Sequence, residues 1–179
     1  MKKNFSDIGD GWTLFLDRDG VINQRIIGSY VTRWAEFKFL PGVLEAMEIL
    51  AQRFKYIIVI TNQQGVGKGL MTMEQVDDIH DRMCSEIESH GGRIDGILVC
   101  PQLATEPNNY RKPDPTMAYT AQDICPEIDL DKCIMVGDGA TDIEFGRNAG
   151  VKTVFIGEEN PNADESFPSL IDFANTLKP

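Results

Sequence analysis

The chain has 179 residues, of which 42 % are hydrophobic and 25 % charged, and its formal net charge is −11. This length suits one well-cored domain, so we expect residues 1–179 to form a single domain with residues 1–12 as a loose leader. The negative charge argues against nucleic acid and anionic membranes as partners, because both bind cationic surfaces. No run approaches the ~18 apolar residues of a membrane span, residues 1–12 lack the apolar core of a signal peptide, and no two cysteines form a C-x-x-C pair. These features predict a cytoplasmic protein.

Strands and helices are expected to alternate along the chain. Apolar runs predict buried strands at 13–17, 56–60 (ending in Thr61-Asn62), 94–100, 133–136 and 153–156. Apolar residues at helical spacing, with start and stop signals, predict helices over 41–53, 72–90, 115–124, 140–149 and 167–177. The alternation predicts an α/β fold: a three-layer, Rossmann-like parallel sheet with helices on both faces. Right-handed crossovers then place the carboxyl ends of all strands at one edge.

Two loops and two histidines need separate interpretation. Residues 20–40 are rich in aromatic and β-branched residues and are expected to form a flap or an irregular hairpin beside that edge. The Gly-rich run 65–69 fits neither the Walker spacing nor the dinucleotide spacing, so we interpret 63–69 as a flexible loop that brings Gln63 and Gln64 toward a substrate. His80 and His90 are interpreted as surface residues.

Carboxylates follow two of the predicted strands. Asp17 and Asp19 follow the first strand, and Asp138 and Asp142 follow the fourth. If these strands are neighbours, Asp17 and Asp138 converge, and converging carboxylates without His or Cys suit Mg²⁺. A carboxylate can also act as a nucleophile toward phosphorus, which makes Asp17 the candidate nucleophile and Asp19 the candidate general acid and base.

Donors for an anionic substrate are expected at the same edge. Thr61, Asn62 and Gln63 follow the second strand, and Arg111 and Lys112 lie in the loop after the third. A lysine supplies a compact charge for one phosphate oxygen, and an arginine supplies a planar fork for two. We therefore expect these five residues to bind a phosphorylated substrate.

Four sequence motifs, taken in order, resemble those of the haloacid dehalogenase-like (HAD) phosphohydrolases. They are Asp17-Arg18-Asp19-Gly20-Val21, Ile60-Thr61-Asn62, Arg111-Lys112-Pro113 and the run from Val136 to Asp142. The resemblance spans residues 13 to 157 and implies a phosphatase without a cap domain, since residues 20–40 are too few for one. It implies Asp17 as nucleophile, Asp19 as acid and base, and an aspartyl-phosphate intermediate.

The resemblance also implies the ligand sets. Mg²⁺ would be bound by Asp17, the Asp19 backbone carbonyl and Asp138, with Asp142 in support. Thr61, Asn62 and Lys112 would hold the phosphate, and Arg111 would add charge on the substrate side. The motifs are most similar to the small capless group that acts on heptose 1,7-bisphosphate and histidinol phosphate. Heptose bisphosphate is the expected substrate, and histidinol phosphate or another sugar phosphate is the alternative.

One loop departs from that group, which usually carries a zinc site. Cys100 is present, but Gln102, Asn108 and Tyr110 stand where the other three ligands are expected. We predict no structural zinc and expect other interactions, such as packing of Tyr110, to order the loop.

A non-catalytic binder of phosphorylated ligands is the competing class of function. Such a protein would lack Asp17, Asp19 or Lys112, and all three are present. The expected partner is a small phosphorylated molecule, and a monomer is the default state.

Overall fold

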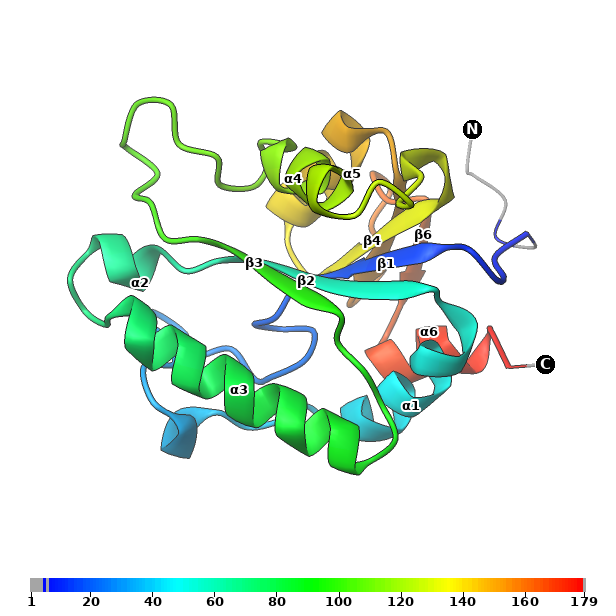
Figure 1. Ribbon diagram of the computed structural model, residues 1–179, viewed down its shortest axis with the longest axis horizontal. Coiled ribbons are helices and arrows are strands. Elements are labelled where there is room, and N and C mark those ends of the chain that lie inside the picture. The colour runs from blue at the N-terminus through cyan, green and yellow to red at the C-terminus, as the bar shows by residue number, and fades with distance from the viewer. Residues whose placement is uncertain (1–4, 6, 179) are drawn as a thin grey trace.

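The predicted parallel sheet is present in the computed structural model, which describes residue 5 and residues 7–178. Six strands pair in the order β3-β2-β1-β4-β5-β6, and all five neighbouring pairs are parallel (Figure 1). The strands are β1 (Thr13–Leu16), β2 (Tyr56–Asn62), β3 (Gly96–Cys100), β4 (Cys133–Gly137), β5 (Lys152–Ile156) and β6 (Glu165–Phe167). β1 lies between β2 and β4, so the first and fourth strands are neighbours, as the convergence of Asp17 and Asp138 requires.

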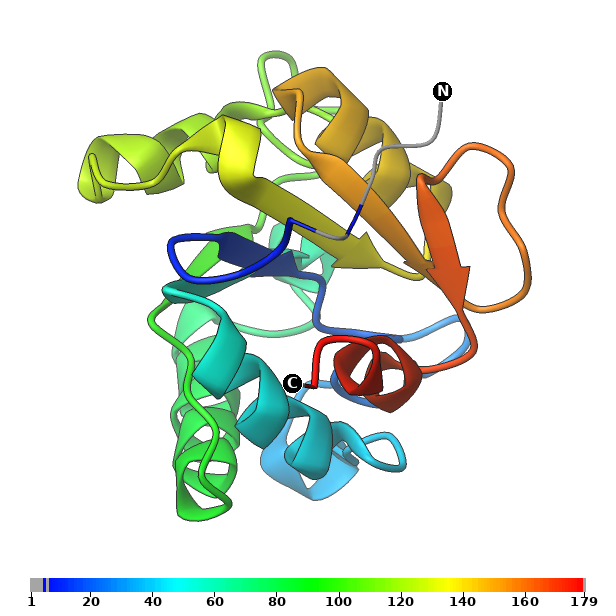
Figure 2. The same cartoon turned by 90° about the vertical axis from the view of Figure 1, so that its right-hand side faces the viewer.

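Helices cover both faces of the sheet, which confirms the three-layer α/β prediction. α1 and α6 lie on one side, and α4 and α5 on the other (Figure 2). The helices are α1 (Val43–Arg53), α2 (Gln64–Gly67), α3 (Met73–Ser89), α4 (Thr116–Ile124), α5 (Ala140–Ala149) and α6 (Leu170–Asn175), with 3₁₀ turns η1 (Trp34–Glu36) and η2 (Leu130–Lys132). α3 begins at the predicted capping box, in which the Thr72 hydroxyl accepts from Gln75 N and the Gln75 side chain accepts from Thr72 N.

The central strands are apolar on both faces, because each face is covered. In β1, Leu14 and Leu16 pack into the core beneath α1 and α3, whereas Phe15 packs into the core on the opposite face. Successive side chains of a strand point to opposite faces, so a near-continuous apolar run is what a doubly covered strand needs. The polar residue that follows each run then lies at the sheet edge.

The 20–40 connection is an irregular hairpin, one of the two forms expected. Gln24 N donates to Lys38 O at 2.8 Å, and Leu40 N donates to Ile22 O at 3.0 Å. Inside the loop, the rings of Trp34 and Phe37 stack with their centroids 5.0 Å apart. The hairpin places residues 25–31 beside the carboxyl edge of the sheet.

The structure corrects two expectations and adds one strand that was not predicted. The leader prediction is wrong for its described part, because Ile8 and Trp12 are buried in the core; residues 1–4 and 6 lie outside the described residues. Residues 64–67 form α2 instead of a flexible loop, and Gly67 N donates to Pro101 O at 3.0 Å. β6 was not predicted, because its three half-buried residues include a glutamate and a serine and show no apolar run.

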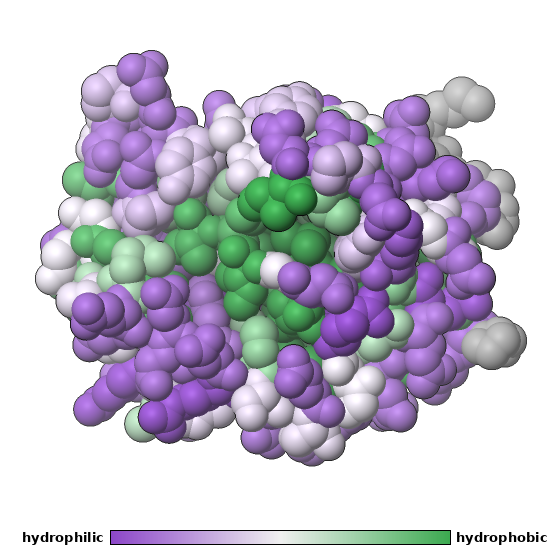
Figure 3. Space-filling model, viewed as in Figure 1, coloured by the Kyte–Doolittle hydropathy of each residue, from purple (hydrophilic) through white to green (hydrophobic). Residues whose placement is uncertain are grey.

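Two surface properties complete the description. Apolar side chains gather on the surface where β3, the edge strand, runs between α3 and α4 (Figure 3). Within the described residues, no helix has both the length and the apolar character needed to cross a membrane.

Candidate active site

Three carboxylates and one lysine meet at the carboxyl edge of the sheet. Lys112 Nζ lies 2.8 Å from Asp17 Oδ1, 2.7 Å from Asp142 Oδ1 and 2.8 Å from Ile60 O, so its three N–H groups are all donated. One oxygen from each of Asp17, Asp138 and Asp142 lies within 4.8 Å of the others. The predicted convergence of Asp17 and Asp138 is therefore observed, and Asp142 joins them.

The charge of this cluster is unbalanced. Burial, together with the charge of Asp142, raises the pKa of Asp17, and Lys112 opposes that shift. Burial alone would lower the pKa of Lys112, but the attraction of Asp142 and Asp17 raises it above the usual value. One buried ammonium group faces three carboxylates, and the further cation at Asp138, Arg25, is exposed. The cluster thus offers hard oxygen ligands and an excess of negative charge to a divalent cation.

Asp19 has a different environment from Asp17. Its Oδ1 accepts from Arg18 Nη2 at 3.0 Å and from Asn23 Nδ2 at 2.9 Å, and its Oδ2 accepts from Gln63 Nε2 at 2.9 Å. Burial raises the pKa of Asp19, but the Arg18 charge and the hydrogen bonds outweigh burial and hold the pKa below its usual value. Asp19 is consequently ionised, and its side chain is held by three donors.

The residues predicted to bind phosphate divide into two groups. Asn62, Arg111 and Lys112 line a cleft of about 450 Å³ that also contains Asp17 and Asp19. Thr61 and Gln63 are buried, and neither lines this cleft. The placement of Gln63, which is 1 % exposed, differs from the prediction, because its amide contacts Asp19 and Thr61 instead of facing the cleft.

Asn62 holds the backbone of the Lys112 loop. Its Oδ1 accepts from Lys112 N at 2.9 Å, and its Nδ2 donates to Lys112 O at 3.2 Å. The side-chain amide thus pairs with both polar backbone groups of one residue. This double contact joins the end of β2 to the loop that carries the lysine.

Hydrogen bonds order the loop after β3. Gln102 Oε1 accepts from Tyr110 N at 3.1 Å, which joins the two arms of the loop, and Tyr110 donates its hydroxyl to Val99 O at 3.2 Å. Glu106 accepts from Leu103 N at 3.0 Å. Tyr110 also packs against the core between the sheet and α4, which agrees with the predicted role of its packing.

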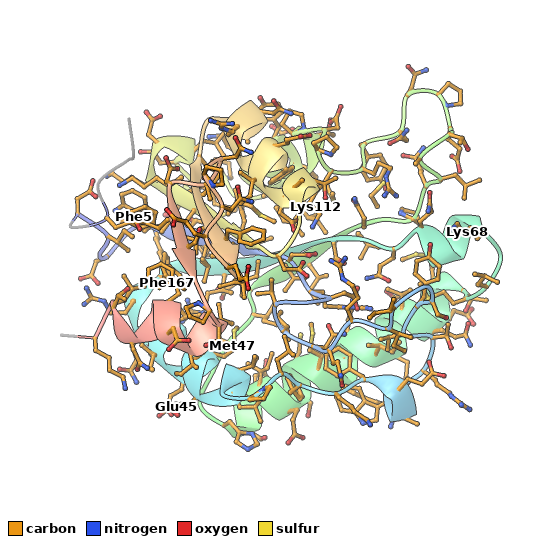
Figure 4. The ribbon with its side chains drawn as sticks, turned by 180° about the vertical axis from the view of Figure 1, so that it is seen from behind. Phe5, Glu45, Met47, Lys68, Lys112 and Phe167 are labelled. Carbon is orange, nitrogen blue, oxygen red and sulfur yellow. The ribbon has the colours of Figure 1, made fainter. Side chains whose placement is uncertain are left out.

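Cations at the mouth of the cleft were missed in the sequence. Arg25 and Lys68 line it together with Tyr30, and Lys68 Nζ lies 5.3 Å from the Tyr30 ring centroid. The buried Nη1 of Arg111 has no acceptor among the residues that the structure describes. Figure 4 shows Lys112 near the centre of the molecule and Lys68 toward the periphery, beside α2. The Gly-Lys-Gly run was a signal for Lys68, whereas nothing distinguished Arg25 from a surface arginine.

His80 was predicted at the surface, and this prediction is wrong. It is 5 % exposed, and its Nε2 lies 3.0 Å from Arg18 Nη1. The available signal was spacing, because His80 lies four residues after Val76 and three before Met83, both on the buried face of α3. Burial, together with the positive charge of Arg18, lowers the pKa of His80 to about 4.

Comparison with known proteins shows the family. Residues 109–172 match the family model described as HAD-hydrolase-like. A D-glycero-alpha-D-manno-heptose-1,7-bisphosphate 7-phosphatase of Mycobacterium tuberculosis (strain H37Rv) is 40 % identical over 173 residues, which cover 93 % of this chain and 91 % of that protein. The chain belongs to the HAD-like hydrolases. It is a phosphatase of this family, as the relatives' names and the family model indicate.

Two further HAD relatives support this assignment. The D-glycero-alpha-D-manno-heptose-1,7-bisphosphate 7-phosphatase of Campylobacter jejuni is 34 % identical, and the match covers 92 % of this chain and 95 % of that protein. The crystal structure of D,D-heptose 1,7-bisphosphate phosphatase from B. bronchiseptica, complexed with magnesium and phosphate, has a TM-score of 0.84 and 28 % identity; the match covers 93 % of this chain and 97 % of that one.

Gly20 is required by the carboxylate of Asp138. A Cβ at Gly20 would lie 1.9 Å from Asp138 Oδ2, and the Gly20 φ is +88°. We expect Gly20→Ala to displace Asp138 and to lose most phosphate release, measured in a steady-state assay. Gly150→Ala is the matched control, because its φ is +78° and, apart from its chain neighbours and adjacent helix backbone, no described residue has a heavy atom within 4 Å of the position that its Cβ would take. Both substitutions cost ~1–2 kcal/mol in backbone strain. Equal activity of the two variants would contradict the role assigned to Gly20.

The buried His80 makes stability depend on pH. Its pKa is about 4 in the folded state and about 6.5 when unfolded, so between these values only the unfolded chain binds the proton. The stabilisation is complete above pH 6.5 and is lost as the pH falls toward 4, by up to about 3 kcal/mol. We expect urea unfolding at pH 7 and pH 4.5 to show a smaller difference for His80→Gln than for the wild type. An identical pH dependence would contradict this assignment.

Proposed function

We propose that the protein hydrolyses the 7-phosphate of D-glycero-D-manno-heptose 1,7-bisphosphate with Mg²⁺ and an aspartyl-phosphate intermediate. The observation that carries the proposal is the pair Asp17 and Asp19 in one cleft, each in a different electrostatic environment. The 40 % identity to a heptose bisphosphate phosphatase over 93 % of the chain supports the substrate.

In the first step, Asp17 acts as the nucleophile. One of its carboxylate oxygens forms a bond to phosphorus while the bond from phosphorus to the ester oxygen breaks. Asp19, ionised before substrate binds, takes up one proton together with the substrate and donates it to the departing oxygen, which leaves as an alcohol. Lys112, which donates to Asp17 at 2.8 Å, keeps the nucleophile oriented.

In the second step, Asp19 acts as a general base. It takes a proton from water as the water oxygen attacks phosphorus, and the bond between phosphorus and Asp17 breaks to release phosphate. The lowered pKa of Asp19 favours the ionised form, which is the form that accepts a proton in this step. The three donors around its carboxylate hold it in place for the incoming water.

Mg²⁺ would be held by Asp17, Asp138 and the Asp19 backbone carbonyl, with Asp142 beside them. The excess of carboxylate over ammonium charge in this cluster fits a divalent cation. When bound, Mg²⁺ offsets the repulsion between the anionic nucleophile and the anionic phosphate and stabilises charge in the transition state. A solved structure with TM-score 0.84 to this one is a complex with magnesium and phosphate, which supports the choice of ion.

A second phosphate explains the cations at the mouth of the cleft. Lys68 and Arg111 add more positive charge beside Lys112 than one phosphoryl group needs, whereas Arg25 pairs with Asp138 at 2.9 Å. The buried Nη1 of Arg111 is available for an acceptor that no described residue supplies. A substrate with a second anionic group away from the reacting phosphate fits this arrangement.

Steady-state kinetics on a panel of substrates test the proposal. The panel contains both anomers of heptose 1,7-bisphosphate, histidinol phosphate and 4-nitrophenyl phosphate. We expect the highest kcat/KM for a heptose bisphosphate, with loss of turnover for all substrates after removal of Mg²⁺ with EDTA or in Asp17→Asn. Highest kcat/KM for histidinol phosphate would assign the alternative substrate. Undiminished activity of Asp17→Asn would overturn the mechanism.

The outer cations should distinguish bisphosphate from monophosphate. We expect Lys68→Ala and Arg111→Ala each to raise KM for heptose bisphosphate by about 10-fold or more, the effect of losing one hydrogen bond to a charged group. KM for 4-nitrophenyl phosphate should change much less. Arg82→Ala is the control, because Arg82 is exposed on α3 and pairs with Asp78. An equal rise in KM for both substrates would show that these cations do not bind the second phosphate.

A further inference from the structure

Arg18, between the two reactive aspartates, is a fully buried arginine. Its exposure is 0 %, and its guanidinium carbon lies 6.0 Å from the centroid of the Phe37 ring. A buried charge needs partners, because leaving water is costly. Arg18 finds them on two sides: Nη2 donates to Asp19 Oδ1 at 3.0 Å, and Nη1 lies 3.0 Å from His80 Nε2.

His80 is the partner of Arg18 contributed by α3. Arginine has no acceptor atom, so the contact is a hydrogen bond only when Nε2 of the imidazole accepts. That requires a neutral ring with its proton on Nδ1, and the lowered pKa of His80 agrees with a neutral ring. A protonated imidazole would place two positive charges in contact inside the core.

The rigidity of the guanidinium connects these two contacts. The group is planar, and its Nη1 and Nη2 cannot move independently. An acceptor that fixes Nη1 therefore also fixes the direction of the Nη2 hydrogen bond to Asp19. Asn23 and Gln63 restrain the same carboxylate from other directions.

We propose that His80 is a positioning residue for the general acid and base: by accepting from Arg18, it orients the guanidinium that holds Asp19. This inference rests on the proposed function, in which Asp19 transfers the proton. His80 does not line the cleft. Among the described residues, Arg18 is the one that joins His80 to Asp19 by hydrogen bonds. The competing interpretation is a core histidine that contributes only to stability.

His80→Leu and His80→Gln separate the two interpretations. Leucine fills similar space without an acceptor, and glutamine retains an acceptor oxygen. We expect His80→Leu to lower kcat for an alkyl phosphate by about 10- to 100-fold, part of the ~10²–10⁴-fold typical of general acid–base catalysis, with KM nearly unchanged. His80→Gln should recover most of that loss. Ile87→Ala is the control, because Ile87 is buried on the same helix.

The leaving group supplies a second readout. A nitrophenolate departs without protonation. Cleavage of 4-nitrophenyl phosphate therefore depends less on proton donation by Asp19 than cleavage of an alkyl phosphate does. In single-turnover measurements, His80→Leu should slow phosphorylation of Asp17 by the alkyl phosphate more than by 4-nitrophenyl phosphate. If His80→Leu does not fold, His80→Asn, whose shorter side chain cannot span the same distance, takes its place.

Two outcomes would overturn the inference. One is a His80→Leu protein that is less thermally stable, like Ile87→Ala, but keeps the wild-type kcat. The other is equal slowing for both leaving groups with no recovery in His80→Gln. Failure of the proposed function is distinguishable, because the wild type itself would then show no hydrolysis that depends on Asp17.

Discussion

The Lys112 ammonium group is the contact on which the rest of the site depends. Its three N–H groups reach the residue after β1, a backbone carbonyl of β2 and the first turn of α5. A buried ammonium group is tolerated only when its donors are satisfied, so these three segments must keep their relative positions. Asn62 then secures the loop that carries the lysine by pairing with its backbone. The order at Asp17, the proposed nucleophile, thus depends on one cation shared by elements distant in the sequence.

Asp17 and Asp19 differ because the chain turns directly after β1. Asp17 continues the strand, since its N–H donates to Val136 O at 3.0 Å, and it faces the carboxylate cluster. Three residues after Asp17, Gly20 N donates to Asn23 O, and this turn directs Asp19 toward Arg18, Asn23 and Gln63. Burial and like charges raise the pKa of the first carboxyl, and surrounding donors lower the pKa of the second. A difference of two positions therefore gives the two carboxyls opposite pKa shifts, as their two proposed roles require.

The sheet and the convergence of its carboxylates were predictable because they follow from short-range patterns. A doubly covered strand shows an apolar run, and parallel crossovers bring the strand ends together. His80, α2 and β6 were missed for different reasons. A buried polar residue on a helix looks like a surface residue until its partner is known, and Arg18 lies 62 positions away. α2 consists of four residues, two of them glycines, and depends on contacts with the loop after β3.

The loop after β3 shows why the placement of the strand-end carboxylates was easier to predict than the placement of Arg111. The proposed reacting groups are held at strand ends, whose positions follow from backbone hydrogen bonding. Arg111, by contrast, follows a loop whose shape depends on side-chain contacts of Gln102, Glu106 and Tyr110. Such contacts have no periodic signature, because a glutamine amide can pair with any nearby backbone group. The position of the Arg111 charge is therefore set by a network that only the folded chain reveals, whereas the positions of Asp17 and Asp138 are set by the sheet.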